Sequence, residues 1–158
     1  MPFKNFAFEL WDNSEFEKIC LALQNQKSLN VLALLYRLWL EHERLELSEP
    51  ALNQSANLLR KADADLLDLF RALRRQLKEC SLTEEHLAPL KQQVLKIELI
   101  VEKKQLAAMQ AHTDRHAKKV LQRPIVVAPY LEQHVPNEGV ELAKFLAQLV
   151  ERQFETKS

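Results

Sequence analysis

Glycine is nearly absent from this chain: it occurs once in 158 residues, at Gly139. Tight β-hairpins and phosphate-binding loops need several glycines, because only glycine adopts positive φ without steric cost. A P-loop and a dinucleotide-binding fingerprint are therefore excluded, and sheet architectures are disfavoured. This one deficit makes an all-helical protein the expectation.

Cysteine is scarce as well, and the net charge is zero. Cys20 and Cys80 lie far apart in the sequence, which is the pattern of neither a metal site nor a disulfide framework. The 22 basic and 22 acidic residues cancel, so no global field would draw the chain to nucleic acid or to an anionic membrane. The first residues show no cationic segment followed by a long apolar run, so no signal peptide is predicted. We expect a reduced, cytoplasmic protein, in which any binding of anionic partners is local.

Catalytic motifs are also missing. The chain has no G-x-S-x-G nucleophile motif, and adjacent carboxylates such as Glu84 and Glu85 lie at a predicted helix start, where capping and the helix dipole explain them. We therefore expect no enzymatic activity, no catalytic residue and no cofactor.

One stretch, residues 30–40, has the sequence NVLALLYRLWL and a single charge, Arg37. At 100° per residue its apolar side chains cover most of the helix circumference, as in a helix packed on several sides. It is shorter than the roughly 20 residues that cross a bilayer, so no membrane span is predicted. The predicted fold is all-α: a single-domain bundle of about six or seven helices around a central buried helix at 30–44. Trp39 should be buried in it.

Helical spacing of apolar residues predicts the surrounding elements. These are helices at 3–11, 14–24, 49–60 and 62–78, a long helix near 89–112 and an amphipathic helix at 139–153. Ser14 with Glu17 forms a capping-box pattern, and Ser28 or Asn30 would cap the central helix.

The C-terminal third loses this periodicity. The predicted division is a helical bundle at 1–112, an irregular strap or linker at 113–136 and an amphipathic C-terminal helix at 137–155. In the strap, Pro124 and Pro129 enclose β-branched residues, which favours extended structure outside any sheet.

The C-terminal helix carries an apolar face, which consists of Leu142, Phe145, Leu146 and Leu149. Leaving such side chains in water forgoes roughly 1.5–3 kcal/mol for each one. The face must therefore bury against its own bundle, a second copy or a partner. We expect its own bundle, because a tethered helix meets its own chain at high effective concentration. The four residues are also candidate partner contacts.

A basic strip marks the end of the helix at 62–78, and it consists of Arg71, Arg74, Arg75 and Lys78. With Arg60 and Lys61 upstream, these cations could contact phosphates. The neutral chain, the lack of interleaved aromatic residues and the nearby Asp68 favour a solvated face, partly paired with acids of the long helix. The strip remains a candidate partner-binding site.

His112 and His116 lie on one face of a helix at i, i+4 spacing, which could hold a transition metal. Asp114 lies on another face, and the HExxH order is absent. We therefore favour two solvated histidines near a helix end, without a structural metal.

Short sequence blocks in the first two thirds of the chain occur in a distinctive order. They are Leu10–Trp11, CLALQ at 20–24, N-x-L-x-L-L-Y-x-LWL at 30–40, ALRRQLK at 72–78 and KIEL at 96–99. In combination they resemble an uncharacterised bacterial family of small all-helical proteins, a domain of unknown function, over about Phe6 to Met109. The resemblance implies a helical fold and brings neither an established activity nor catalytic residues.

The function itself is unknown from the sequence, and two classes stay open. The favoured one is a non-enzymatic helical interaction or adaptor module of the bacterial cytoplasm, with an unidentified protein partner. The alternative is weak binding of nucleic acid or phosphate through the basic strip at 71–78.

Overall fold

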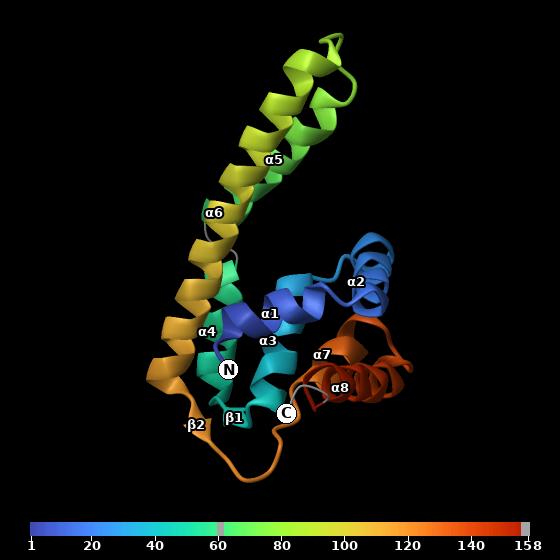
Figure 1. The fold of residues 1–158 in the computed structure, drawn as a ribbon. Helices are drawn as coiled ribbons and strands as arrows, with labels where there is room; N and C mark the ends of the chain where they lie inside the picture. The colour runs from blue at the N-terminus through green and yellow to red at the C-terminus, as the bar shows by residue number, and fades with distance from the viewer. Residues whose placement is uncertain (60–61, 156–158) are drawn as a thin grey trace. The chain divides into compact units, whose positions relative to one another are not determined.

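The structure, a computed structural model, describes residues 1–59 and 62–155. Within them it contains eight helices and one pair of two-residue strands (Figure 1). In chain order the elements are α1 (Phe3–Trp11), α2 (Ser14–Lys27), α3 (Val31–His42), β1 (Leu45–Glu46), α4 (Glu49–Leu59), α5 (Ala62–Leu77), α6 (Glu84–His116), β2 (Lys118–Lys119), α7 (Val127–His134) and α8 (Gly139–Glu155). The predicted all-α fold class is confirmed.

Contacts divide the chain into two compact units. Unit 1 combines Met1–Ser48 with the residues from Arg115 onward, and unit 2 is Glu49–Asp114. The sequence predicted a single domain with parts at 1–112, 113–136 and 137–155. These boundaries differ from those of the two units, because α7 and α8 both pack with α3 inside unit 1.

The core of unit 1 is built around α3. Seven of its residues are buried: Ala33, Leu34, Leu35, Tyr36, Leu38, Trp39 and Leu40. Trp39 is 1% exposed, and its Nε1–H donates to the carbonyl oxygen of Met1 at 2.9 Å. The ring of Phe3, on α1, lies 5.2 Å from the Trp39 ring and 5.4 Å from the Tyr36 ring. The predicted burial of the helix and of Trp39 is confirmed.

Asparagine side chains cap the starts of two helices of unit 1. Asn30 Oδ1 accepts a hydrogen bond from the backbone N–H three residues on at 3.0 Å, so one of the two predicted caps of α3 is present. The capping box predicted at Ser14 is wrong. Asn13 caps α2 instead, and its Oδ1 accepts from the backbone N–H groups of Glu15 and Phe16 at 3.1 Å. The N-cap of α2 is therefore Asn13, one residue before the predicted cap Ser14, and Asn13 satisfies the free N–H groups of the first turn.

The prediction of irregular structure at 113–136 is wrong for residues 127–134, which form α7. Glu41, on α3, accepts hydrogen bonds at its Oε1 from the backbone N–H groups of Val126 and Val127, at 2.8 and 2.9 Å. This carboxylate therefore caps α7 from 85 residues earlier in the chain. Pro129 falls in the first turn of α7, where its missing N–H costs nothing. Local sequence patterns contain no sign of such a cap.

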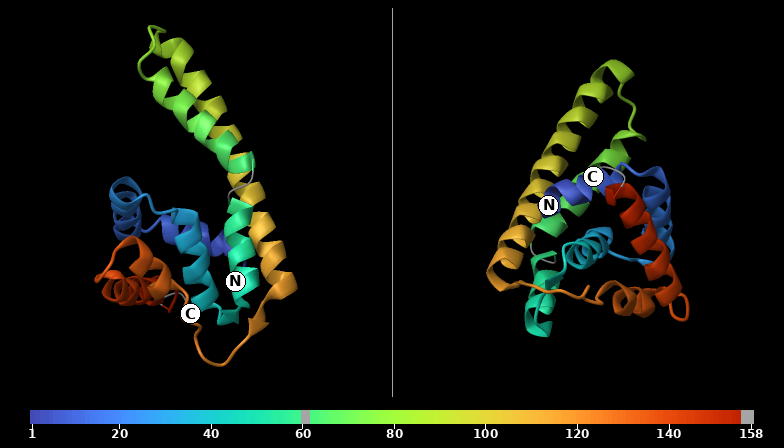
Figure 2. Two further views of the ribbon diagram at one scale, coloured as in Figure 1. Left: turned by 180° about the vertical axis from the view of Figure 1, so that it is seen from behind. Right: turned by 60° about the horizontal axis from the view of Figure 1, so that its bottom comes forward.

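The C-terminal helix α8 packs against α7 and α3 (Figure 2). Leu146 and Leu149 are 0% and 1% exposed, so two of the four residues of the predicted apolar face are buried within their own chain. Gly139 starts α8. A Cβ at this position would overlap the backbone N and Cα of Glu132 on α7, so the single glycine permits the close approach of the two helices.

In unit 2, α5 and the first half of α6 run side by side in opposite directions (Figures 1 and 2). The long helix predicted near 89–112 extends from Glu84 to His116, through Pro89. Its buried residues in unit 2 recur mostly at three- or four-residue intervals: Leu87, Val94, Glu98, Val101, Gln105, Leu106, Met109, His112 and Thr113. This line of residues supplies the interior of unit 2.

Candidate interaction surfaces

The three arginines of the predicted basic strip lie on α5, and two of them are paired with acids. Arg71 lies 3.6 Å from Asp68 and 3.4 Å from Glu102 on α6. Arg74 donates to Oε2 of Glu98, a carboxylate that is 5% exposed. The predicted pairing with acids of the long helix is confirmed for both arginines.

The other two members of the strip are exposed: Arg75 lies on α5, and Lys78 follows the end of α5. The sequence suggested that Arg60 and Lys61 extend the basic strip, but both lie outside the described residues. Arg75 and Lys78 could position a phosphate, but they offer nothing that would distinguish one nucleotide sequence from another.

The four candidate contacts on α8 divide into two groups. Leu146 and Leu149 belong to the core of unit 1, whereas Leu142 is half-buried and Phe145 is 39% exposed. A partner could reach Leu146 and Leu149 only if α8 left its own unit. We therefore do not retain them as surface contacts.

A third surface lies on the α5–α6 hairpin, and we call it the hairpin face. It consists of Leu66, Leu69 and Leu73 on α5 and Leu90, Ile97 and Ile100 on α6. Their exposed fractions lie between 38% for Ile97 and 67% for Leu69 and Ile100. Leu67, on α5, is by contrast only 3% exposed.

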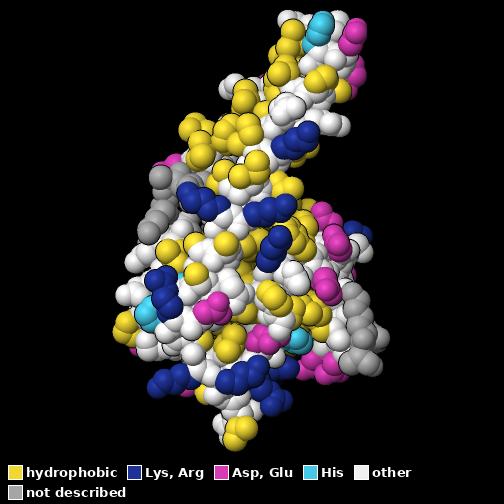
Figure 3. Space-filling view, turned by 60° about the vertical axis from the view of Figure 1, so that its left-hand side comes forward, with side chains coloured by type: hydrophobic (Ala, Val, Ile, Leu, Met, Phe, Trp, Pro, Cys, Tyr) yellow, Lys and Arg dark blue, Asp and Glu magenta, His cyan; other side chains and the backbone are white. Residues whose placement is uncertain are grey.

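The six residues of the hairpin face lie on one side of the hairpin. An α-helix turns by about 100° per residue. The three α5 residues therefore lie roughly 140–160° around the helix from Arg71, and the three α6 residues lie roughly 120–160° around it from Glu102. Since that pair joins the two helices on one side, the six residues lie together on the other. Figure 3 shows hydrophobic side chains gathered over this hairpin, in the upper part of the view. Leu95 and Leu99 are exposed too, but they lie on the side of the ion pair.

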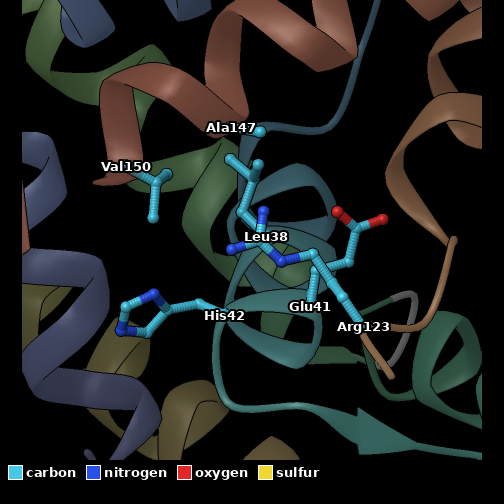
Figure 4. Close-up of a pocket in the computed structure, with 6 residues that line it drawn as sticks. All are labelled: Leu38, Glu41, His42, Arg123, Ala147 and Val150. Atoms are coloured by element: carbon cyan, nitrogen blue, oxygen red, sulfur yellow. The ribbon is translucent and has the colours of Figure 1, made fainter. Parts of the chain in front are cut away.

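A small cavity in unit 1 offers little room for chemistry (Figure 4). It is lined by Leu38, Glu41, His42, Arg123, Ala147 and Val150, and its volume is about 10 Å³. This is space for about one water molecule. Burial lowers the pKa of His42, and the Glu41 carboxylate is already engaged as the cap of α7. The cavity is therefore no substrate site.

The histidines near the end of α6 differ in environment. His112 is 5% exposed, and its Nε2 lies 2.8 Å from the carbonyl oxygen of Ala51, whereas His116 is exposed. The prediction of two solvated histidines is therefore wrong for His112, which contacts the backbone of α4. Across residues 1–59 and 62–155, no three His, Cys, Asp or Glu side chains are grouped so that they could hold a metal ion.

Cys20 lies in the core of unit 1. It is fully buried, and burial raises the pKa of its thiol to about 12. Cys80, in unit 2, is exposed. At neutral pH the Cys20 thiol is therefore protonated and shielded from reagents.

Comparison with known proteins concerns most of the chain. A family model described as a protein of unknown function, DUF2390, matches residues 3–109. The chain belongs to the DUF2390 family. The resemblance inferred from the CLALQ and LWL blocks is thereby confirmed. No curated protein and no solved structure matches the chain. The residues matched to DUF2390 include all of α5 and the part of α6 that carries the hairpin face. Among the described helices, none has the length and apolar character to cross a membrane.

Proposed function

We propose that this DUF2390 protein is a non-enzymatic interaction module of the cytoplasm that binds a protein partner through the hairpin face. The observation that carries the proposal is the exposure of Leu69 and Ile100, each 67%, within a surface that four further aliphatic residues extend. Soluble monomers seldom leave contiguous apolar patches larger than a few hundred Å² in water, and larger ones mark interaction sites.

The shape of the surface favours a helical partner. Two adjacent antiparallel helices accept a further amphipathic helix in the geometry of a helical bundle. The six residues together expose the equivalent of about three whole aliphatic residues. Burying these would contribute roughly 5–9 kcal/mol before the costs of association, which are of similar size. Affinity would therefore depend on polar contacts at the rim as well.

The alternative is binding of nucleic acid or phosphate through residues 71–78. This alternative has weaker support than the hairpin face. Arg71 and Arg74 already pair with acids, and they would have to exchange those partners for a phosphate. Only the exposed Arg75 and Lys78 would meet a phosphate without such an exchange.

Site-specific photo-crosslinking in the cells that make the protein tests the proposal. A photoreactive residue at Leu69, and separately at Ile100, should give the same discrete protein adduct. The matched control is Leu99, which is 41% exposed on the opposite side of the hairpin and should not give it. An adduct of twice the chain mass would identify the partner as a second copy. Equal adducts at Leu99, or none at Leu69 and Ile100, would contradict the proposal. Nuclease-sensitive retention of nucleic acid that Arg75→Glu abolishes would favour the alternative.

A further inference from the structure

The segment between β2 and α7 presents aliphatic side chains to solvent in unit 1. Leu121 is 92% exposed and Ile125 is 77% exposed, the two largest exposed fractions among the large hydrophobic residues of the described chain. The loop lies at the foot of the view in Figure 1. We call residues 118–125 the tip loop. Both side chains therefore lie outside the core of unit 1.

Positive charge surrounds the tip loop. No Asp or Glu occurs between Arg115 and Leu131, whereas Lys118, Lys119 and Arg123 lie within the loop itself. Figure 3 shows Lys and Arg side chains gathered directly above a hydrophobic tip, at the bottom of the view. The charge is local, as it must be in a chain with zero net charge.

Acidic groups of neighbouring elements offset part of this charge. Glu43 Oε2 lies 3.8 Å from Lys119 Nζ, and Glu151 on α8 lies 3.1 Å from Arg123. Both pairs involve half-exposed or exposed cations, which are screened by water and exchange partners readily. The cations therefore stay able to meet an anionic surface.

The backbone holds the tip loop in place at both ends. β2 pairs antiparallel with β1, and the N–H of Val120 donates to the carbonyl oxygen of Arg44 at 2.9 Å. Arg44 Nη1 donates in turn to the carbonyl oxygen of Leu121 at 3.2 Å. At the other end the Glu41 carboxylate fixes Val126. The exposed aliphatic side chains are thus carried by an anchored loop.

We propose that the tip loop docks unit 1 on anionic phospholipid surfaces. Leu121 and Ile125 would enter the interface between head groups and acyl chains, while Lys118, Lys119 and Arg123 contact head-group phosphates. A bilayer accepts isolated aliphatic side chains without shape complementarity, whereas a protein needs a matching pocket for each. The cavity beside Arg123 has a volume of about 10 Å³, so it is too small to accept a side chain from a protein partner. The charge pattern and the isolated apolar tips together favour lipid over an acidic protein. The proposal is independent of the hairpin face, which belongs to unit 2.

Vesicle sedimentation with the full chain tests the proposal. The protein should bind vesicles that contain phosphatidylglycerol, bind pure phosphatidylcholine vesicles weakly, and lose binding as salt is raised. The double variants Leu121→Ser/Ile125→Ser and Lys118→Gln/Lys119→Gln should each weaken partitioning about tenfold or more. All four positions are exposed, so circular dichroism should show unchanged helix content.

The matched control removes the same charge elsewhere. Lys96→Gln/Lys103→Gln changes two exposed lysines of α6 and should leave vesicle binding intact. An equal loss in this control, or full binding by Leu121→Ser/Ile125→Ser, would mean nonspecific electrostatic adsorption and would overturn the proposal. Absence of binding to phosphatidylglycerol vesicles would overturn it as well. Absence of vesicle binding together with capture of a poly-glutamate peptide would assign the loop to an acidic protein segment.

Discussion

The two units of this protein bury different kinds of residue. The core of unit 1 is apolar and aromatic, with Phe3, Phe6, Phe16, Tyr36 and Trp39 at most 1% exposed. The buried polar residues of the described chain all lie in unit 2, and they are Ser55, Glu98, Gln105, His112 and Thr113. Unit 2 also carries the half-exposed leucines and isoleucines of the hairpin face. Unit 1 thus has an apolar and aromatic core, whereas the interior of unit 2 mixes apolar with polar side chains, and its hairpin exposes further apolar ones.

This difference leads us to expect different effects of substitutions in the two units. Interiors are close-packed, so we expect the aromatic cluster around α3 to contribute strongly to the stability of unit 1. The hairpin of unit 2 leaves unburied the area that a partner would cover, which is how a binding surface differs from a core. Substitutions in unit 1 should therefore cost stability, and substitutions on the hairpin face should cost binding.

The largest effect is expected for Trp39→Ala. Removing a fully buried indole leaves a cavity, and such changes cost about 3–5 kcal/mol. Denaturant unfolding followed through Trp11, which also belongs to unit 1, measures the loss. Alkylation of Cys20 should accelerate in parallel, because its shielded thiol becomes reactive when unit 1 opens. A cost below about 1 kcal/mol would contradict the role given to α3.

Gly139→Ala is expected to cost about 1–3 kcal/mol, the usual range for overpacking. The added Cβ would overlap the backbone of Glu132, so α8 or α7 must shift. Val140→Ala is the control, since Val140 is 49% exposed on the same helix and should change stability little. Equal unfolding midpoints for Gly139→Ala and wild type would show that the two helices are not closely packed.

Arg74→Ala should destabilise unit 2 by about 1–3 kcal/mol, because it leaves a buried carboxylate without its cation. Glu98 is 5% exposed, and its Oε1 already has no hydrogen-bond partner. Combining Arg74→Ala with Glu98→Met should restore the loss, since an apolar side chain suits the site. Circular dichroism during thermal unfolding follows both variants. If the double variant is less stable than Arg74→Ala, the ion pair is not what stabilises the hairpin.

The smallest effect on stability is expected for Leu69→Ser with Ile100→Ser. Both side chains are 67% exposed, so unfolding free energies should change by at most about 0.5 kcal/mol. Binding of the partner found by crosslinking should nevertheless fall at least tenfold, since the centre of an interface carries most of its energy. Leu67→Ala, at a buried position on the same helix, should show the reverse pattern. A large stability loss in the serine variant would make the hairpin face part of a core.

Among the described helices the sequence predicted all but α7, and it predicted the burial of α3. The run at 30–40 predicts its own burial because it is apolar on nearly every side, so no choice of face is needed. Helix α7 escaped prediction because Glu41 caps it from another helix. For α5, helical spacing identifies the apolar face correctly but cannot show whether the chain itself covers that face. Spacing likewise gave no sign that His112 would meet the backbone of Ala51.

Native-state hydrogen exchange on the full chain tests the central claim most directly, because it reads both units in one experiment. We predict that amides of α3 exchange slowest, through global opening of unit 1. Those of α5 should exchange far faster, through local opening of a hairpin whose apolar face lacks cover. Protection of α5 equal to that of α3 in the isolated protein would contradict the account.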